Sequence, residues 1–218
     1  MKRDLPPDEP APRGAARDRI LTQAVELFAA YGFDAMTMRR LGDAVGLDNS
    51  SLYRHFRSKA ALADAVLDHV AGEMLSRMAP QIDPSRPATL QGLEDACALA
   101  GLYFFDHPAA ARVMVHWIMS MGSDGPGFAV SVPANDTSRP GGALLAVVRD
   151  WLEAGVREGA LRRHAMPDAV VILLGAILIR PATRGYLLVS LEPKRRPAAA
   201  RAAWEDEIRA VVRGAFAP

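Results

Sequence analysis

Residues 37–59 have the sequence TMRRLGDAVGLDNSSLYRHFRSK, in which the pair Gly46-Leu47 separates two short apolar patterns. The first has the spacing of a helix capped by Thr37, with apolar positions Leu41, Ala44 and Val45. The second follows a cluster of capping residues at 48–51, with apolar positions Leu52 and Phe56. Glycine readily adopts the left-handed conformation that ends a helix, so Gly46 allows a sharp turn. This pattern predicts a helix-turn-helix whose second helix protrudes and fits the major groove of DNA.

Helical patterns continue on both sides of this motif. Apolar residues from Ile20 to Tyr31 predict a first helix of about 15 residues that stops at Gly32. On the other side, Ser58 can cap a long helix whose apolar face continues to Met78. Residues 1–14 contain four prolines and mixed charges without periodicity, which predicts a flexible arm.

The rest of the chain has helical patterns and no strong strand pattern. Predicted helices cover 89–106, 108–121, 143–158, a segment that begins near Pro167, and 197–216. Proline suits the first turn of a helix, whereas Pro181 is expected to kink or interrupt the segment that Pro167 begins. Residues 122–142 are rich in Gly, Pro, Ser and Asn, which predicts a loop that is partly disordered or acts as a lid. The predicted fold is all-α, with about nine helices.

Composition is typical of a globular protein, because half of the 218 residues are apolar and 23% are charged. Cys97 is the only cysteine, which excludes an internal disulfide and favours a reducing compartment. The longest strongly apolar run, 169–179, is far shorter than the roughly 20 residues that cross a bilayer. The first residues lack the apolar core of a signal peptide. We therefore expect a cytoplasmic protein that does not bind membranes.

Charge alone does not identify a partner. The net charge is +1, but DNA binding needs a local basic patch rather than a global excess. Between Arg13 and Lys59 the chain has eight basic and five acidic residues, a modest bias of +3. This bias permits nucleic-acid binding.

A longer pattern makes the helix-turn-helix specific, because it resembles the DNA-binding domain of the TetR family of repressors. The matching positions are Gly32-Phe33, Thr37-Met38-Arg39, Leu41, Ala44, Val45-Gly46-Leu47, Leu52-Tyr53-Arg54-His55-Phe56, Ser58-Lys59 and Leu62. The rest of the chain resembles the family only in helix count, length and the loop before the seventh helix. The resemblance implies a DNA-binding domain at 15–61 and, at 62–218, a domain that binds an effector and dimerises.

The resemblance also implies a set of DNA contacts: Thr37, Arg39, Arg40, Asn49, Ser50, Ser51, Tyr53, Arg54, His55 and Lys59. Their chemistry agrees with such roles. The hydroxyl and backbone N–H of Thr37 at a helix start suit a phosphate, as does the charge of Lys59. One of Arg39 and Arg40 can reach a base edge and the other the backbone. The three residues at 49–51 should face bases, and those at 53–55 can reach flanking phosphates.

Several of these positions also fit structural roles. Tyr53 and Phe56 suit the core, and Arg39 and Arg40 suit a solvated helix face. His55 fits a phosphate contact or half-buried packing. Asp48 is interpreted mainly as a helix cap, although a carboxylate there can also accept a hydrogen bond from cytosine. Many relatives have a glycine near position 50, so base preference cannot be transferred to this chain.

By the same resemblance, the eighth and ninth helices form the interface of a homodimer. One recognition helix reads few base pairs, whereas two related by a twofold axis read a palindrome. Residues 169–179 are apolar all round, as expected for a helix covered by its own domain and by a partner. The ninth helix has an apolar stripe: Trp204, Ile208, Val211 and Val212. The alternative is that this stripe belongs to the core of a single chain.

The family places an effector cavity among the fourth to seventh helices. Candidate lining residues are Met74, Met78, Phe104, Phe105, Met114, His116, Trp117, Met121, Arg149 and Trp151. Methionine and aromatic side chains adapt to an apolar ligand, and His116 and Arg149 are candidate polar anchors. A stripe of such residues is also typical of an ordinary core. No cofactor or metal is implied.

Two other function classes were considered. An enzyme is disfavoured because the sequence has no nucleophile elbow, phosphate-binding glycine loop or metal-ligand spacing. A helical protein-interaction module has no reason to bind DNA with a steep salt dependence. The favoured function is a ligand-responsive repressor that binds a palindromic operator as a homodimer and is released by a small molecule.

Overall fold

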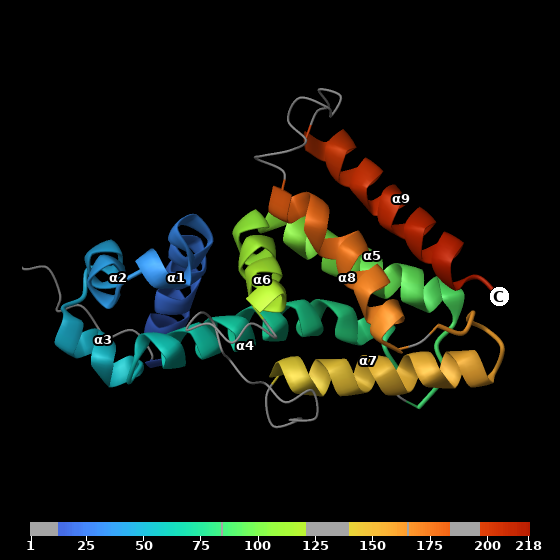
Figure 1. Ribbon diagram of the computed structural model, residues 1–218, viewed down its shortest axis with the longest axis horizontal. Coiled ribbons are helices and arrows are strands. Elements are labelled where there is room, and N and C mark those ends of the chain that lie inside the picture. The colour runs from blue at the N-terminus through green and yellow to red at the C-terminus, as the bar shows by residue number, and fades with distance from the viewer. Residues whose placement is uncertain (1–12, 84, 121–139, 165, 184–196) are drawn as a thin grey trace, which may run out of the picture.

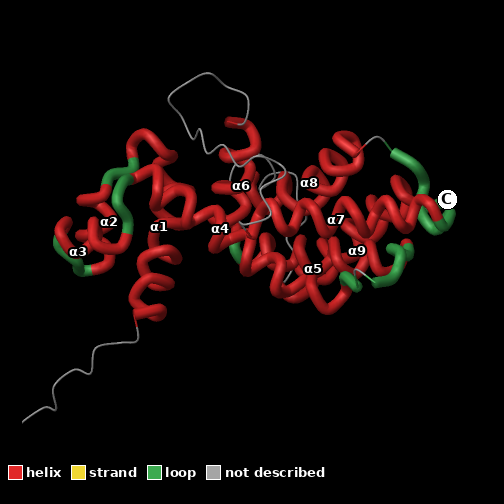
Figure 2. Tube along the Cα trace, turned by 90° about the horizontal axis from the view of Figure 1, so that it is seen from below, coloured by secondary structure: helices red, strands yellow, loops and turns green. Residues whose placement is uncertain are grey.

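The computed structural model describes residues 13–83, 85–120, 140–164, 166–183 and 197–218, and these contain helices and no strand. Figure 2 shows helices joined by short loops along these segments. The predicted all-α class is confirmed, and the predicted number of about nine helices agrees with the nine α-helices among the described residues. The predicted loop at 122–142 lies almost entirely outside the described residues, as does most of the predicted arm.

Three helices form one end of the elongated molecule, on the left of Figure 1: α1 (Arg13–Ala35), α2 (Met38–Val45) and α3 (Asn49–His55). The long α4 (Lys59–Met78) leads from them to the larger domain, and a single 3-10 turn, η1 (Ala79–Gln81), follows. α1 begins earlier than its apolar pattern predicts. Its predicted stop is a kink, because Gly32 has a φ of 72° inside the helix.

The described part of the larger domain contains five further helices: α5 (Leu90–Asp106), α6 (Pro108–Ser120), α7 (Pro140–Arg157), α8 (Met166–Thr183) and α9 (Pro197–Phe216). The expected interruption at Pro181 is not seen, since α8 continues to Thr183. Only two helical residues follow this proline, so its missing N–H affects only the end of the helix. Among the described residues, no helix is long and apolar enough to cross a membrane.

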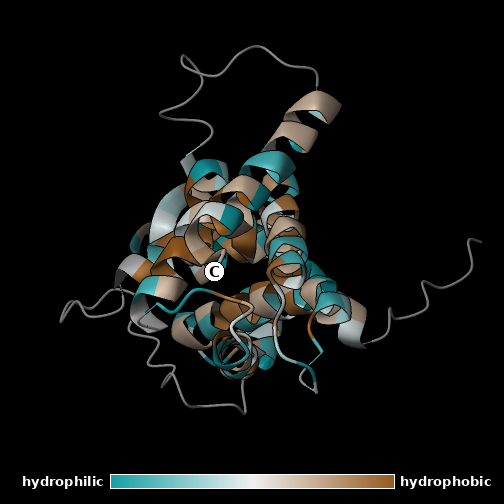
Figure 3. Cartoon of the chain, turned by 90° about the vertical axis from the view of Figure 1, so that its right-hand side faces the viewer, coloured by the Kyte–Doolittle hydropathy of each residue, from teal (hydrophilic) through white to brown (hydrophobic). Residues whose placement is uncertain are grey.

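α5 is the central helix of this domain and packs against α4, α8 and α9. Gly101 gives room for Ile208 of α9, because a Cβ at this position would overlap Cδ1 of that side chain. The indole N–H of Trp204 donates to the Gly101 carbonyl at 3.0 Å. The buried carboxylate of Glu94 accepts two hydrogen bonds from Arg213, at 2.9 and 2.7 Å. Figure 3 looks along the molecule onto this domain, where apolar brown segments line the faces between helices.

Candidate nucleic-acid interface

The turn between α2 and α3 is built by two glycines. Gly46 has φ 71° and ψ 33°, the left-handed conformation expected of it, and its N–H donates to the carbonyl of Gly42. Gly42 was not singled out by sequence, yet a Cβ there would lie 2.6 Å from the carbonyl oxygen of Leu47. The N–H of Leu47 also donates to the Gly42 carbonyl, at 2.9 Å. The small residue inside α2 therefore allows the chain to fold back tightly before α3.

An apolar base holds the three helices together. Ile20 of α1, Leu41 of α2 and Leu52 of α3 are all at most 1% exposed, and Phe56 is 2% exposed. Burial distinguishes Tyr53 from Phe56, both of which suited the core by sequence. Phe56 is a core residue, whereas Tyr53 is half exposed. These buried side chains hold α2 and α3 against α1, and the polar residues of α2 and α3 remain at the surface.

Helix α3 is capped by Asp48. Its Oδ1 accepts from the Ser51 N–H and from the Ser50 hydroxyl, both at 2.7 Å. These hydrogen bonds, with the side chain of Ser50 as the largest contribution, lower the pKa of Asp48 below its ordinary value. The interpretation of Asp48 as a helix cap is confirmed by this geometry. Thr37 caps α2 in the same way, accepting from the N–H of Arg40 at 3.2 Å.

The predicted DNA contacts differ in how their side chains are engaged. Arg39, Asn49 and Tyr53 are exposed, and no hydrogen bond or ring contact engages their side chains among the described residues. Ser51 accepts from Arg54 at 2.7 Å, and the Arg40 guanidinium stacks 3.9 Å from the ring centroid of Tyr31. His55 is half-buried, with its ring 6.4 Å from that of Phe56.

Lys59 has a third kind of environment. Its Nζ donates to the carbonyls of Phe33, Asp34 and Met36 at 2.9, 3.2 and 3.3 Å, and lies 4.5 Å from the centroid of the Phe33 ring. An ammonium group has three donors, so these carbonyls engage all of them. Lys59 therefore ties the start of α4 to the end of α1, and a phosphate contact requires it to release at least one carbonyl.

Two arginines of α1 have roles that sequence reasoning missed. Arg17 donates to the carbonyl of His55 at 3.3 Å and lies 4.5 Å from the ring centroid of Phe56. Arg19 donates to the carbonyl of Val45 at 3.4 Å. Both carbonyls lie at helix ends, where cations are favoured by the helix dipole. Their only sequence signal is positive charge, which cannot distinguish a helix cap from a DNA contact.

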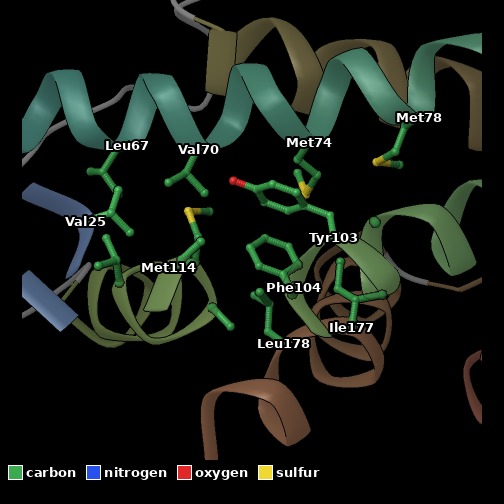
Figure 4. Close-up of a cluster of buried hydrophobic side chains, with 14 of the residues drawn as sticks. Val25, Leu67, Val70, Met74, Met78, Tyr103, Phe104, Met114, Ile177 and Leu178 are labelled. Carbon is green, nitrogen blue, oxygen red and sulfur yellow. The ribbon is translucent and has the colours of Figure 1, made fainter. Parts of the chain in front are cut away.

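The candidate effector residues lie mostly in the core of the larger domain. Met74, Met78, Phe104 and Met114 are at most 8% exposed, and Figure 4 shows them in one apolar cluster with Tyr103. Trp151 is also buried, Phe105 and Trp117 are half-buried, and His116 and Arg149 are exposed. Arg149 pairs with Asp150 at 2.9 Å. Met121 lies outside the described residues.

One polar atom in this region is left without a partner. The indole Nε1 of Trp117 is buried and makes no hydrogen bond among the described residues. The thiol of Cys97 is also buried, and this burial raises its pKa to about 12, which disfavours the reactive thiolate form.

The apolar stripe predicted on the ninth helix divides between two faces. Trp204, Ile208 and Val212 are at most 5% exposed, and α9 packs on α5 of the same chain, so they belong to the intrachain core. Val211 alone of the four is exposed, at 48%. α8 buries Leu173, Ile177 and Leu178 but exposes Val171 and Ile179, at 68% and 52%. Exposed apolar side chains thus remain on both helices that were predicted to dimerise.

Comparison with known proteins finds relatives of this chain among bacterial transcriptional regulators. The family described as bacterial regulatory proteins, tetR family, matches residues 20–66. The chain is 28% identical over 166 residues to the HTH-type transcriptional repressor KstR2 of Mycolicibacterium smegmatis, which covers 76% of this chain and 77% of that protein. It is also 33% identical over 64 residues to the class A tetracycline repressor of Escherichia coli, covering 29% of this chain and 30% of that protein.

Solved structures agree in fold over nearly the whole chain. A tetR-family regulatory protein from Rhodococcus RHA1 has a TM-score of 0.60 at 20% identity, covering 90% of this chain and 96% of that one. FadR of Bacillus subtilis, solved in complex with stearoyl-CoA, has a TM-score of 0.57 at 16% identity, covering 89% of this chain and 98% of that one. At these identities the likeness concerns the fold.

Proposed function

The chain belongs to the TetR family of bacterial regulatory proteins, and we propose that it is a repressor that binds a palindromic operator as a homodimer and leaves it when a small apolar molecule binds. The observation that carries this proposal is the α2–α3 unit, which has a capped recognition helix and exposed Arg39, Asn49 and Tyr53. Exposed Arg39 and Asn49, in the first turns of α2 and α3, can read base edges without rearrangement of the core, and exposed Tyr53 can reach a flanking phosphate.

We assign different tasks to the other predicted contacts. The hydroxyl and N–H groups at the start of α2, near Thr37, suit a phosphate at a positive helix end, and Ser50 would face bases beside Asn49. Arg40, Arg54 and His55 would contact flanking phosphates, and Ser51 would help to hold Arg54. Lys59 acts mainly through the position of α4, because its ammonium group already binds carbonyls of α1.

A duplex-selection experiment with a random double-stranded library tests the DNA-binding part. We expect a palindrome whose half-sites lie about one helical turn, roughly 34–36 Å, apart. Asn49→Ala should relax preference at one position of each half-site by about 1–3 kcal/mol, without loss of folding stability. Failure of the folded protein to enrich any sequence at low salt contradicts the proposal and favours the protein-interaction module.

The dimer interface is proposed on α8 and α9. Val171, Ile179 and Val211 are exposed apolar residues on these helices, and burial against a second copy would remove them from water. The double variant Val171→Asp/Ile179→Asp should be monomeric in light scattering and lose operator affinity. Because both substituted residues are exposed, the double variant should keep the helicity of the unchanged protein. Arg86→Asp, an exposed substitution outside these helices, serves as the control. A variant that remains dimeric excludes this interface.

The effector is proposed to bind among α4, α5, α6 and α7, within the Met and aromatic cluster. The support is chemical: adaptable apolar side chains surround Met74 and Phe104, and the buried Trp117 N–H has no described acceptor. α4 extends from Lys59 to Met78, about 30 Å for its 20 residues, so it can connect the cluster to the DNA-binding end. The ligand acts through its different affinities for two arrangements of α4.

A release assay tests this part. Compounds with apolar bodies and a hydrogen-bond acceptor are screened for displacement of the selected operator. Trp117→Phe should weaken an active compound about tenfold and leave operator affinity unchanged, because phenylalanine keeps the apolar ring but has no donor. An active compound that is indifferent to Trp117→Phe and to Met74→Ala binds elsewhere.

A further inference from the structure

A cavity of about 270 Å³ lies at the end of the molecule farthest from α3, where the last turn of α7, residues 158–164, the start of α8 and the end of α9 meet. Figure 1 shows this end beside the C-terminus, opposite the helix-turn-helix. None of its lining residues is among the predicted effector contacts. It is therefore separate from the proposed operator contacts and from the proposed effector cluster.

The floor of this cavity is apolar. Leu152, Leu161, Ala169 and Phe216 are at most 3% exposed, and Val156 is half-buried beside them. Such a floor favours an apolar group, because contact with it removes that group from water.

The rim of the cavity is basic. Arg157, Arg162 and Arg163 line it with His164, and Glu153 is the single carboxylate in the lining. No ion pair or side-chain hydrogen bond engages the three guanidinium groups within the described part of the chain. The local charge therefore favours an anion, and guanidinium groups bind carboxylates with charge-assisted hydrogen bonds.

The basic loop is fixed to its surroundings. Gly159 has a φ of 73° in the turn that follows α7, and the N–H of Ala160 donates to the Gly155 carbonyl at 2.9 Å. The N–H of Arg162 donates to the carbonyl of Phe216 at 2.9 Å, and Nε2 of His164 lies 2.8 Å from the carbonyl of Ala215. These bonds hold the backbone of the rim against the end of α9, so less order must be gained when a ligand binds.

We propose that this cavity is a binding site for a small amphipathic carboxylate, with the apolar body on the floor and the carboxylate among the arginines. The volume is just below the roughly 300–1,000 Å³ of sites for drug-sized ligands, which suits a short acyl chain. The site goes beyond the proposed function, since it shares no residue with the operator contacts or with the effector cluster.

Calorimetric titration of the full-length protein with octanoate tests the proposal. Octan-1-ol has the apolar chain without the carboxylate, and acetate has the carboxylate without the long chain. We expect one octanoate per chain, and at least about tenfold weaker binding of the other two. The triple variant Arg157→Gln/Arg162→Gln/Arg163→Gln should weaken octanoate at least about tenfold, because exposed arginines can be changed without loss of folding. Arg86→Gln, exposed and outside the cavity, should bind as the unchanged protein does.

Two further variants separate this site from the others. Val156→Trp should reduce octanoate binding by filling the cavity without changing its charge, and circular dichroism checks that the variant is folded. Trp117→Phe should leave octanoate binding unchanged. If this variant binds octanoate much more weakly, octanoate binds in the effector cluster and the proposal is overturned. Equal binding of octanoate and octan-1-ol, or no saturable octanoate binding at millimolar concentration, also overturns it. Operator affinity is measured separately, so failure of DNA binding is distinguishable from failure of this site.

Discussion

The helix-turn-helix and the α5–α9 contact use polar side chains in opposite ways. In the first, Thr37, Asp48 and Ser58 each accept from a backbone N–H three residues later, and Arg39 and Asn49, which we propose to read bases, remain exposed. In the second, Glu94 pairs with Arg213 across 119 residues of sequence, and Trp204 bonds to Gly101 across 103. Local caps hold short helices at a small loss of chain entropy, because their partners are near in sequence. The distant pairs instead join helices that lie far apart in the chain. A substitution at an exposed residue such as Arg39 should therefore cost less stability than one at a residue that holds α5 to α9.

The largest effect is expected from Arg213→Met. This change leaves the carboxylate of Glu94, which is 2% exposed, without its charged partner. Because the Arg213 side chain is itself 61% exposed, we expect a loss of about 2–3 kcal/mol in the free energy of unfolding, less than for a fully buried pair. Urea denaturation measures it.

The matched control is Arg201→Met, at the same contact. Arg201 pairs with Asp106 at 3.3 Å, and both side chains are more than 40% exposed. The expected loss is below about 1 kcal/mol, since water can replace the arginine. If the two variants lose the same free energy of unfolding, burial of Glu94 does not make its pair with Arg213 more important than the exposed pair.

The two regions also differ in how far sequence could predict them. Helix caps and turns depend on neighbours in the chain, so Thr37, Gly46 and the bounds of α9 at 197–216 could be identified from the pattern. Trp204 and Ile208 could not be divided between core and dimer interface, because periodicity marks an apolar face but not what covers it. The partner of Glu94 lies more than one hundred residues away and has no local signal.

Even in the helix-turn-helix, some roles depend on three-dimensional contacts. The family resemblance implies that Lys59 contacts a phosphate, and no spacing rule indicates the carbonyls of Phe33, Asp34 and Met36 around it. Gly42 was missed for a similar reason, because its constraint comes from the carbonyl of Leu47 across the turn.

Gly42→Ala should therefore disturb the DNA-binding end as a unit. A Cβ 2.6 Å from a backbone oxygen cannot be relieved by a side-chain rotation, so the turn itself must move. We expect a loss of about 1–2 kcal/mol in stability and a weaker operator complex. Gly72→Ala is the control, because that helical glycine has open space around its Cβ position and should gain up to about 1 kcal/mol. If both alanines are stabilising, the tight turn is not a constraint in solution.

Lys59→Met distinguishes a tie between helices from a phosphate contact. Loss of three hydrogen bonds from a charged, partly buried donor should cost about 1 kcal/mol or more of stability. If Lys59 acts only through α4, the salt dependence of operator affinity should stay the same. A slope smaller by about 0.9 shows instead that this lysine neutralises a phosphate in the complex. Arg57→Met, an exposed basic change two residues away, provides the comparison.

The smallest effect is expected at the cap of α3, and it depends on pH. Hydrogen bonds from Ser50 and Ser51 lower the pKa of Asp48 in the folded chain. Its contribution to stability is therefore fully present above the ordinary value of 3.8 and is lost as the pH falls through the lowered pKa. Asp48→Asn keeps a capping oxygen but cannot titrate. The difference in unfolding free energy between the two proteins should be constant from neutral pH down to about pH 5 and should change only in stronger acid. A difference that changes between pH 6 and 8 would mean that another group controls the cap.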